Sequence, residues 1–157
     1  MMITQQQLDA YLGKSIGEIC RNGYSSVADN HCAHFVAHVL GYSFGVTCRM
    51  MGNGRGDAAT LRVQELFPRC KAVGVWSLRP ASLQSCLVFM TRSGNVNLSS
   101  KVMANVPRKH VGIFLKGFIW HYSNSRQQVV RQTPSQFSIH YPSPDNAMFY
   151  GSLPSPS

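Results

Sequence analysis

The sequence predicts a single α+β domain, in which N-terminal helices pack on a central antiparallel sheet of about five to six strands. Apolar residues follow helical spacing in the first part of the chain and the alternation of short strands from about residue 72 onward. The 157 residues show no internal repeat and no linker that would divide them. We therefore expect one domain over residues 1–152 and a disordered, Pro/Ser-rich tail over residues 153–157.

Three helices are expected in the first part of the chain. Thr4 and Gln7 form a capping box, which predicts a helix that begins directly after Thr4. The next helix is predicted from apolar residues at i, i+3, i+4, i+7 and i+8, namely Cys32, Phe35, Val36, Val39 and Leu40. Gly41 ends that helix. A third helix is expected over residues 58–67, with Asp57 as its cap.

The second part of the chain reads as short strands. Runs rich in β-branched and aromatic residues predict strands over residues 72–76, 86–90, 110–115, 118–122, 128–132 and 147–150. Lys116 and Gly117 predict a tight hairpin between two of them. The polar stretch 93–109 is expected to be a mobile loop.

The chain is strongly basic, with 15 Lys and Arg residues against 6 Asp and Glu residues and a formal charge of +9. Such a surface attracts polyanions, whether nucleic acid, anionic lipid or an acidic cell wall. The basic residues form no dense run, and no nucleic-acid-binding signature accompanies them, so we expect no nucleic acid partner. No apolar stretch approaches the roughly 20 residues of a membrane span, and no signal peptide is visible at the N-terminus.

The cysteine pattern gives no indication of a metal site. The five cysteines are Cys20, Cys32, Cys48, Cys70 and Cys86, and none belongs to a C-x-x-C pair, so a structural zinc site is not expected. His34 and His38 have the i, i+4 spacing of a zinc hydrolase motif, but the glutamate of that motif is missing. We therefore expect no metal and no cofactor. The cysteines other than Cys32 either form up to two disulfides, in one of three connectivities, or remain buried thiols.

Cys32 is the candidate nucleophile, because a thiol in the first turn of a helix has its pKa lowered by unpaired N–H groups and the helix dipole. His110 opens a predicted strand and is the candidate base. His121 lies on the paired strand, nearly opposite His110, with the two Cβ atoms about 5 Å apart, so it can fix the tautomer of His110. The alternative is that Cys32 simply fills a core position on its helix.

Four segments carry a resemblance to a known family, namely residues 32–36, 86–89, 110–115 and 118–123. Together they resemble the NlpC-type papain-like cysteine peptidases and the related CHAP amidases, which cleave peptidoglycan stem peptides. The resemblance implies a papain-like fold and amide hydrolysis through a thioester at Cys32, with His110 as base and His121 as its orienting partner. It also implies the backbone N–H of Cys32 as one oxyanion donor.

We expect Tyr24, His31 and Trp120 to contact the substrate, with Tyr24 also a candidate second oxyanion donor. A small, basic chain of this type resembles a phage endolysin or an amidase toxin of a type VI secretion system. Such a protein is expected to be a monomer, exported without a signal peptide to the periplasm or cell wall, where it acts on peptidoglycan peptides. As a toxin it would also have an immunity or inhibitor protein.

Two other functions remain open. The residues around Cys32 also resemble the "NCEHFV" box of lecithin:retinol acyltransferase-like enzymes, which would make the chain a lipid deacylase or acyltransferase. In that permuted group the histidines precede the cysteine, whereas here Cys32 comes first, so the order along the chain favours the cell-wall peptidases. The third hypothesis is a basic binding module without catalytic activity, in which Cys32 is structural.

Overall fold

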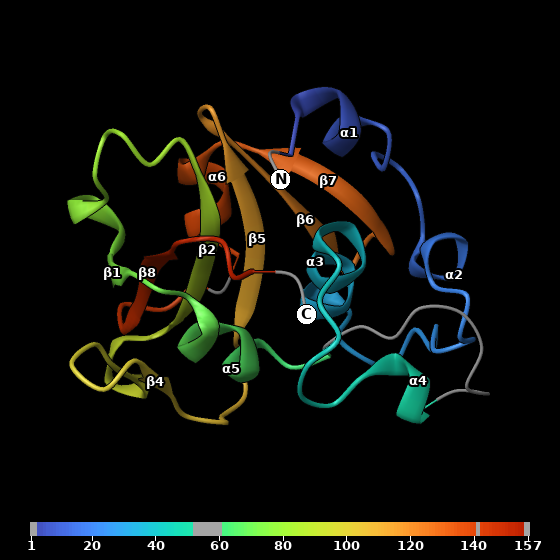
Figure 1. Cartoon of the computed structure of the whole chain (residues 1–157), viewed down its shortest axis with the longest axis horizontal. Coiled ribbons are helices and arrows are strands. Elements are labelled where there is room, and N and C mark those ends of the chain that lie inside the picture. Colours follow the sequence, from blue (N-terminus) through green and yellow to red (C-terminus); the bar gives the residue numbers. More distant parts are fainter. Residues whose placement is uncertain (1–2, 52–60, 141, 156–157) are drawn as a thin grey trace.

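The computed structural model describes residues 3–51, 61–140 and 142–155. Its centre is a six-stranded sheet in the order β1-β8-β2-β5-β6-β7, with every neighbouring pair antiparallel (Figure 1). In chain order its strands are β1 (Val73–Val75), β2 (Ser85–Arg92), β5 (His110–Leu115), β6 (Phe118–Ser123), β7 (Gln128–Gln132) and β8 (Asn146–Gly151). The expected α+β class and antiparallel sheet are therefore confirmed.

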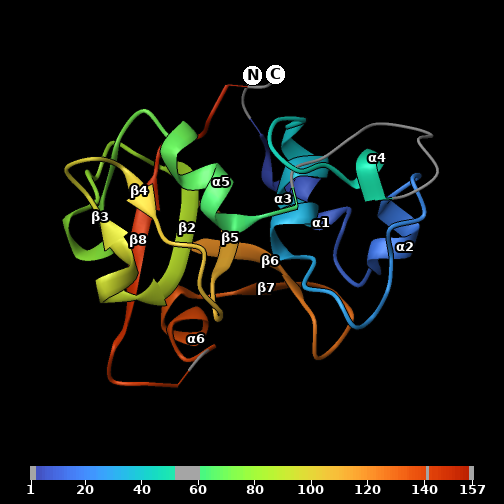
Figure 2. The same cartoon turned by 90° about the horizontal axis from the view of Figure 1, so that it is seen from below.

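Short helices lie on both faces of this sheet. They are α1 (Gln5–Asp9), α2 (Ile16–Ile19), α3 (Cys32–Leu40), α4 (Cys48–Met51), α5 (Val63–Leu66) and α6 (Pro134–Ser138). Figure 2 shows α1, α3 and α5 on one side of the sheet and α6 on the other. None of the helices in the described residues is long and apolar enough to cross a membrane.

The local signals explain where the predicted helices begin and end. The capping box of α1 is present, since the Gln7 N–H donates to Thr4 Oγ1 and the Thr4 N–H donates to Gln7 Oε1. Helix α3 ends at Gly41, whose φ of 78° needs a residue without a Cβ. The third helix is shorter than predicted, because α5 begins only at Val63; the expected cap Asp57 lies outside the described residues.

The hairpin between β5 and β6 confirms the predicted turn. Lys116 and Gly117 both have positive φ, 47° and 93°, as the mirror-image turn of a two-residue hairpin requires. Ile113 pairs with Trp120, and Leu115 pairs with Phe118. This register determines which side chains of the two strands share a face.

Further parts of the fold differ from the prediction, including the short helices α2 and α4, which were not expected. The expected loop 93–109 contains a small separate sheet of β3 (Val96–Asn97) and β4 (Val102–Met103). Helix α6 was not predicted, although Thr133 and Gln136 form a capping box that signals it. The expected disordered tail is wrong for Pro154, which is buried and accepts a hydrogen bond from the Tyr42 hydroxyl at 2.8 Å.

The sheet separates two apolar cores. The larger one lies on the side of α1, α3 and α5 and includes Val111 and Ile113 of β5, whereas the smaller one includes Phe114 of β5 and Phe137 of α6. Successive side chains of a strand point to opposite faces. His110 therefore shares the α6 face with Phe114, while its neighbour Val111 faces α3.

Candidate functional site

Cys32 is the first residue of α3 and is almost completely buried. Burial raises the pKa of its thiol to about 11, although the N–H groups of Val111 and Ala33 act in the opposite direction. The thiol points to the carbonyl oxygen of Lys109, which lies 4.0 Å from Sγ. At neutral pH Cys32 is thus a protonated thiol in this arrangement, rather than the thiolate expected from its helix position.

Two asparagines hold the start of α3 in place. Asn30 Oδ1 accepts hydrogen bonds from the Cys32 N–H at 3.0 Å and from Asn124 Nδ2 at 2.7 Å. The His31 N–H donates to Asn124 Oδ1 at 3.1 Å. These contacts satisfy N–H groups that a helix leaves unpaired in its first turn and tie α3 to the end of β6.

A cavity of about 250 Å³ adjoins the thiol. Its lining includes Cys32 and Asn30 and three basic residues, Arg62, Arg108 and Lys109. Arg108 has a φ of 63°, a left-handed conformation that costs a non-glycine residue on the order of 1 kcal/mol. Because the described residues of its lining include three cations and no acidic residue, this cavity favours an anionic group.

His110 and His121 form a buried hydrogen-bonded pair, with Nε2 of His110 2.9 Å from Nδ1 of His121. Nε2 of His121 lies 2.6 Å from Gln132 Oε1, an oxygen that can only accept. His121 Nε2 therefore donates to Gln132, and His121 Nδ1 accepts from His110 Nε2. In the neutral ring of His110 the lone pair is then on Nδ1.

The surroundings of this pair come from α6 and the residues after it. His140 stacks on His110, with ring centroids 3.9 Å apart, and Phe137 contacts both rings. Burial lowers the pKa of His110 well below its usual value and lowers that of His121 to about 4. Both imidazoles are thus neutral at pH 7. His140 was not predicted as part of the site.

The structure does not assemble the predicted contact between Cys32 and His110. Cys32 packs in the core on the α3 side, whereas the His110 ring contacts Phe137 and His140 on the α6 side. Within residues 3–51, 61–140 and 142–155, no imidazole nitrogen forms a hydrogen bond with the Cys32 thiol. Strand alternation is the reason, because Val111, and not His110, is the residue of β5 that faces the helix.

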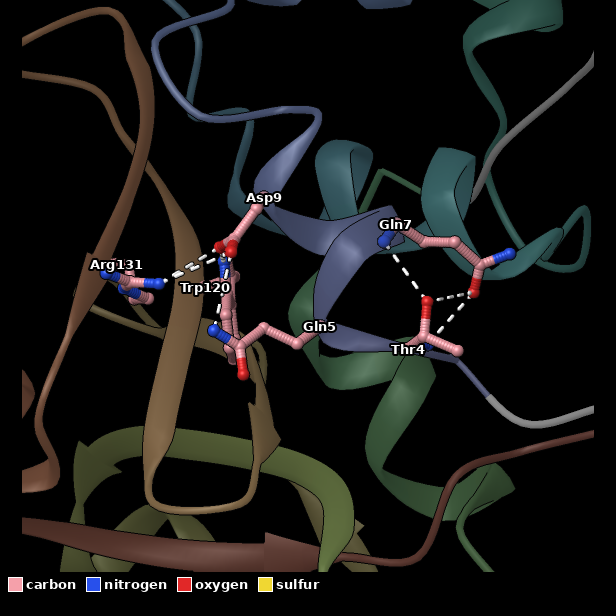
Figure 3. A network of polar contacts seen from close by, with 6 residues as sticks. All are labelled: Thr4, Gln5, Gln7, Asp9, Trp120 and Arg131. Carbon is pink, nitrogen blue, oxygen red and sulfur yellow. Dashed lines mark hydrogen bonds and ion pairs between the residues drawn. The ribbon is translucent and has the colours of Figure 1, made fainter.

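Trp120, which was predicted to contact the substrate, lies in the core of this structure. It is fully buried on the α3 side, and its Nε1–H donates to Asp9 Oδ1 at 3.0 Å. Arg131 donates to the same oxygen at 3.2 Å, so Asp9 joins the indole to β7 (Figure 3). The ring of Trp120 thus belongs to the core, and its contact with a substrate stays a prediction.

His31 and Tyr24 lie away from the cavity of Cys32. His31 is buried and contacts His34, with 3.0 Å between the two Nδ1 atoms, and it lines a separate cavity of about 160 Å³. The Tyr24 ring packs against both histidines, with centroids 5.4 and 5.5 Å away. Neither residue is among those that line the cavity beside Cys32, so their predicted substrate contacts are not supported there.

Among the described residues, two groups of side chains have the composition of metal sites. The first is Cys20, His34, His38 and Cys48, and the second is His110, His121 and His140; within each group the ligand atoms all lie within 4.8 Å of one another. The prediction of no metal site did not anticipate the first group, because its residues come from three separate segments without a short spacing motif. The i, i+4 pair His34 and His38 was the available signal. Burial lowers the pKa of His34 to about 3, so it is neutral.

All five cysteines are buried, and among the described residues none forms a disulfide. Burial raises the pKa of Cys70 and of Cys86 to about 12, which makes both unreactive thiols. Of the alternatives that the sequence left open, buried thiols are therefore the one that this structure has.

Comparisons with known proteins assign no family. No family model matches the chain, and neither a curated protein nor a solved structure matches it. The function is therefore argued from the residues of the site.

Proposed function

We propose that the protein is a cysteine hydrolase that cleaves amide bonds, with Cys32 as nucleophile and His110 as general base. The observation that carries this proposal is the chain of hydrogen bonds from His110 through His121 to Gln132. A thiol hydrolase needs a neutral base that can take the thiol proton and a third group that holds its tautomer. The lone pair on His110 Nδ1 meets the first requirement, and His121 meets the second.

The position of Cys32 supports the same proposal. It opens α3, and the N–H groups of Ala33 and Val111 act on its sulfur to favour the thiolate. Its Sγ lies 4.0 Å from the carbonyl oxygen of Lys109, the residue directly before His110. Catalytic hydrogen bonds are often long in free enzymes and tighten in the substrate complex. The proposal requires a larger rearrangement than this, in which the His110 ring leaves Phe137 and His140 on the α6 side and its Nδ1 reaches Cys32 Sγ.

The reaction then follows the thioester route. His110 takes the thiol proton, Cys32 sulfur bonds to the amide carbon, and the amine leaves with the proton from His110. Water, deprotonated by His110, hydrolyses the thioester, which returns the thiol and releases a carboxylic acid. The Cys32 N–H is a candidate donor to the oxyanion once Asn30 releases it.

Peptidoglycan stem peptides are the proposed substrate. These peptides carry carboxylates, and Arg62, Arg108 and Lys109 line the cavity beside Cys32. The resemblance of the Cys32 and His110 segments to NlpC-type peptidases and CHAP amidases supports the same substrate. The papain-like arrangement and a role as a secreted toxin or endolysin belong to this proposal.

Digestion of purified sacculi tests it. We expect wild-type protein to release muropeptides whose masses identify the cleaved amide bond, and Cys32→Ala and His110→Ala to release none. Cys86→Ala, which alters a buried cysteine on the other side of the sheet, is the matched control and should retain activity. Release by Cys32→Ala at the wild-type rate would refute the proposal, as would cleavage of phospholipid instead of peptidoglycan.

One observation favours a second candidate, a basic binding module without catalysis. The Cys32 thiol is buried, has a raised pKa and lacks an imidazole partner among the described residues. In that case wild type and Cys32→Ala would bind sacculi equally well, and neither would release fragments. Substituting Arg62 and Arg108 would weaken the binding.

A further inference from the structure

Four side chains that the proposed hydrolase does not use converge between the N-terminal helices. Cys20 directly follows α2, His34 and His38 lie one turn apart on α3, and Cys48 opens α4. Nε2 of His34 lies 3.0 Å from Nε2 of His38, which lies 3.7 Å from Cys48 Sγ. In a tetrahedral zinc site the corresponding separations are about 3.3 Å between nitrogens and about 3.6 Å between nitrogen and sulfur.

Hydrogen bonds from neighbouring residues orient the ligand atoms of this group toward one another. His31 Nε2 donates to the Ser26 carbonyl at 2.7 Å, so His31 Nδ1 accepts from His34 Nδ1. The lone pair of His34 is then on Nε2, the atom that faces His38. A hydrogen bond that fixes the tautomer of a ligand histidine in this way is the usual second shell of a metal site.

The sulfur of Cys48 also has a hydrogen-bond partner, the side-chain amide of Asn22. Asn22 is fully buried, and its Nδ2 donates to Cys48 Sγ at 2.9 Å. An N–H group that points at sulfur stabilises a thiolate, the form in which cysteine binds metals. The group thus offers two imidazole nitrogens and two sulfurs, all within 4.8 Å of one another.

We propose that Cys20, His34, His38 and Cys48 bind one structural Zn²⁺ ion. Two thiolates and two neutral imidazoles form a ligand set that suits Zn²⁺ and excludes the hard cations Mg²⁺ and Ca²⁺. Three of the four ligands are buried and His38 is half-buried. Four protein ligands leave no open coordination site, which is typical of a structural site and not of a catalytic one. On binding, the two thiols release their protons.

The ion would join segments that have little other regular structure. Helices α2 and α4 have four residues each, so neither is stable by itself. A metal that joins both to α3 would hold the start of α3, where Cys32 lies, against the sheet. The proposal does not depend on the hydrolase, since none of the four ligands has a role in the catalytic scheme.

Metal analysis of the purified full chain tests the site. We expect about one zinc per chain, and, after exchange, a Co²⁺ complex with the intense visible bands of tetrahedral coordination and a thiolate-to-cobalt charge-transfer band. Cys48→His keeps four ligands, so it should retain the visible bands and lose about half of the charge-transfer intensity. His38→Ala should lower zinc affinity at least tenfold.

Two control variants locate the ion. Cys70→Ala removes a buried cysteine outside the group, and His140→Ala removes a ligand of the other candidate cluster; both should retain one zinc per chain. A wild-type protein that binds neither zinc nor cobalt would overturn the proposal. A metal that is lost in His140→Ala and kept in Cys48→Ala would also overturn it, because the ion would then belong to the cluster of His110.

Discussion

His110 and His121 lie diagonally across the β5–β6 hairpin, with 2.9 Å between Nε2 of the former and Nδ1 of the latter. The register that pairs Ile113 with Trp120 places Gly112, and not His110, opposite His121. The sequence predicted the two histidines to be nearly opposite, and the shift of two residues keeps them on the same face. Gly112 lies beside this contact, since a Cβ added to it would lie 3.0 Å from His121 Cβ.

Gly112→Ala should disturb this contact. An added Cβ would lie 2.7 Å from Ile119 Cγ2 and 3.0 Å from His121 Cβ, and both are held in the sheet. We expect a loss of about 1–3 kcal/mol in the free energy of unfolding, measured with urea. Gly94→Ala, where no atom lies within 4 Å, is the control and should change stability by at most about 0.5 kcal/mol. Equal effects of the two variants would contradict the geometry.

Acid should destabilise the protein through the buried histidines. Burial lowers the pKa of His121 to about 4, from its ordinary value of about 6.5, so the unfolded chain binds a proton in this range and the folded chain does not. Stability is therefore present above pH 6.5 and falls as the pH drops toward 4. Burial also lowers the pKa of the neighbouring His110 and His140, so their protonation in acid destabilises the folded state in the same way.

The measurement is urea unfolding at a series of pH values. For His121 the expected loss between pH 7 and pH 4 is on the order of 2–3 kcal/mol. His121→Asn cannot take up this proton and should show a shallower decline with acid, whatever its stability at pH 7. A decline as steep as that of the wild type would show that His121 does not contribute.

Alkylation of Cys32 should be slow in the protein without substrate. Burial raises the pKa of the thiol to about 11, so the thiolate that reacts is scarce at pH 7. We expect iodoacetamide, followed by mass spectrometry, to modify Cys32 at least about a hundredfold more slowly than an unfolded peptide of residues 28–36. The rate should rise with pH up to the point where the protein unfolds. Rapid modification at pH 7 would mean that a thiolate exists before substrate binds.

The bond from Trp120 to Asp9 should matter more than the ion pair beside it. Asp9→Ala leaves the buried indole N–H without its acceptor, so we expect a loss of about 1–3 kcal/mol in the free energy of unfolding. Arg131→Ala removes an ion pair whose side chains are 36% and 35% exposed, which is worth at most about 1 kcal/mol. If the two variants are equally destabilised, and only at low salt, the ion pair is the dominant contact instead.

Local signals in the sequence determined the elements and part of the site. The capping box of Thr4, the apolar spacing from Cys32 to Leu40 and the turn at Lys116 and Gly117 each act over a few residues, and each is present as predicted. The strand that begins at His110 has its predicted bounds. The contact between His110 and His121 also followed, because a tight hairpin places its two strands side by side.

Tertiary structure decided which face each side chain occupies and which distant residues meet. Cys32 packs against the α3 side of the sheet, whereas the side chain of His110 points from β5 to the α6 side, because successive residues of a strand point to opposite faces. The spacing between a helix and a strand in the sequence does not reveal this. The grouping of Cys20, His34, His38 and Cys48 depends on how the end of α2 and the start of α4 pack onto α3. Sequence patterns report contacts along one element or across one turn, whereas packing between elements is set by the whole core.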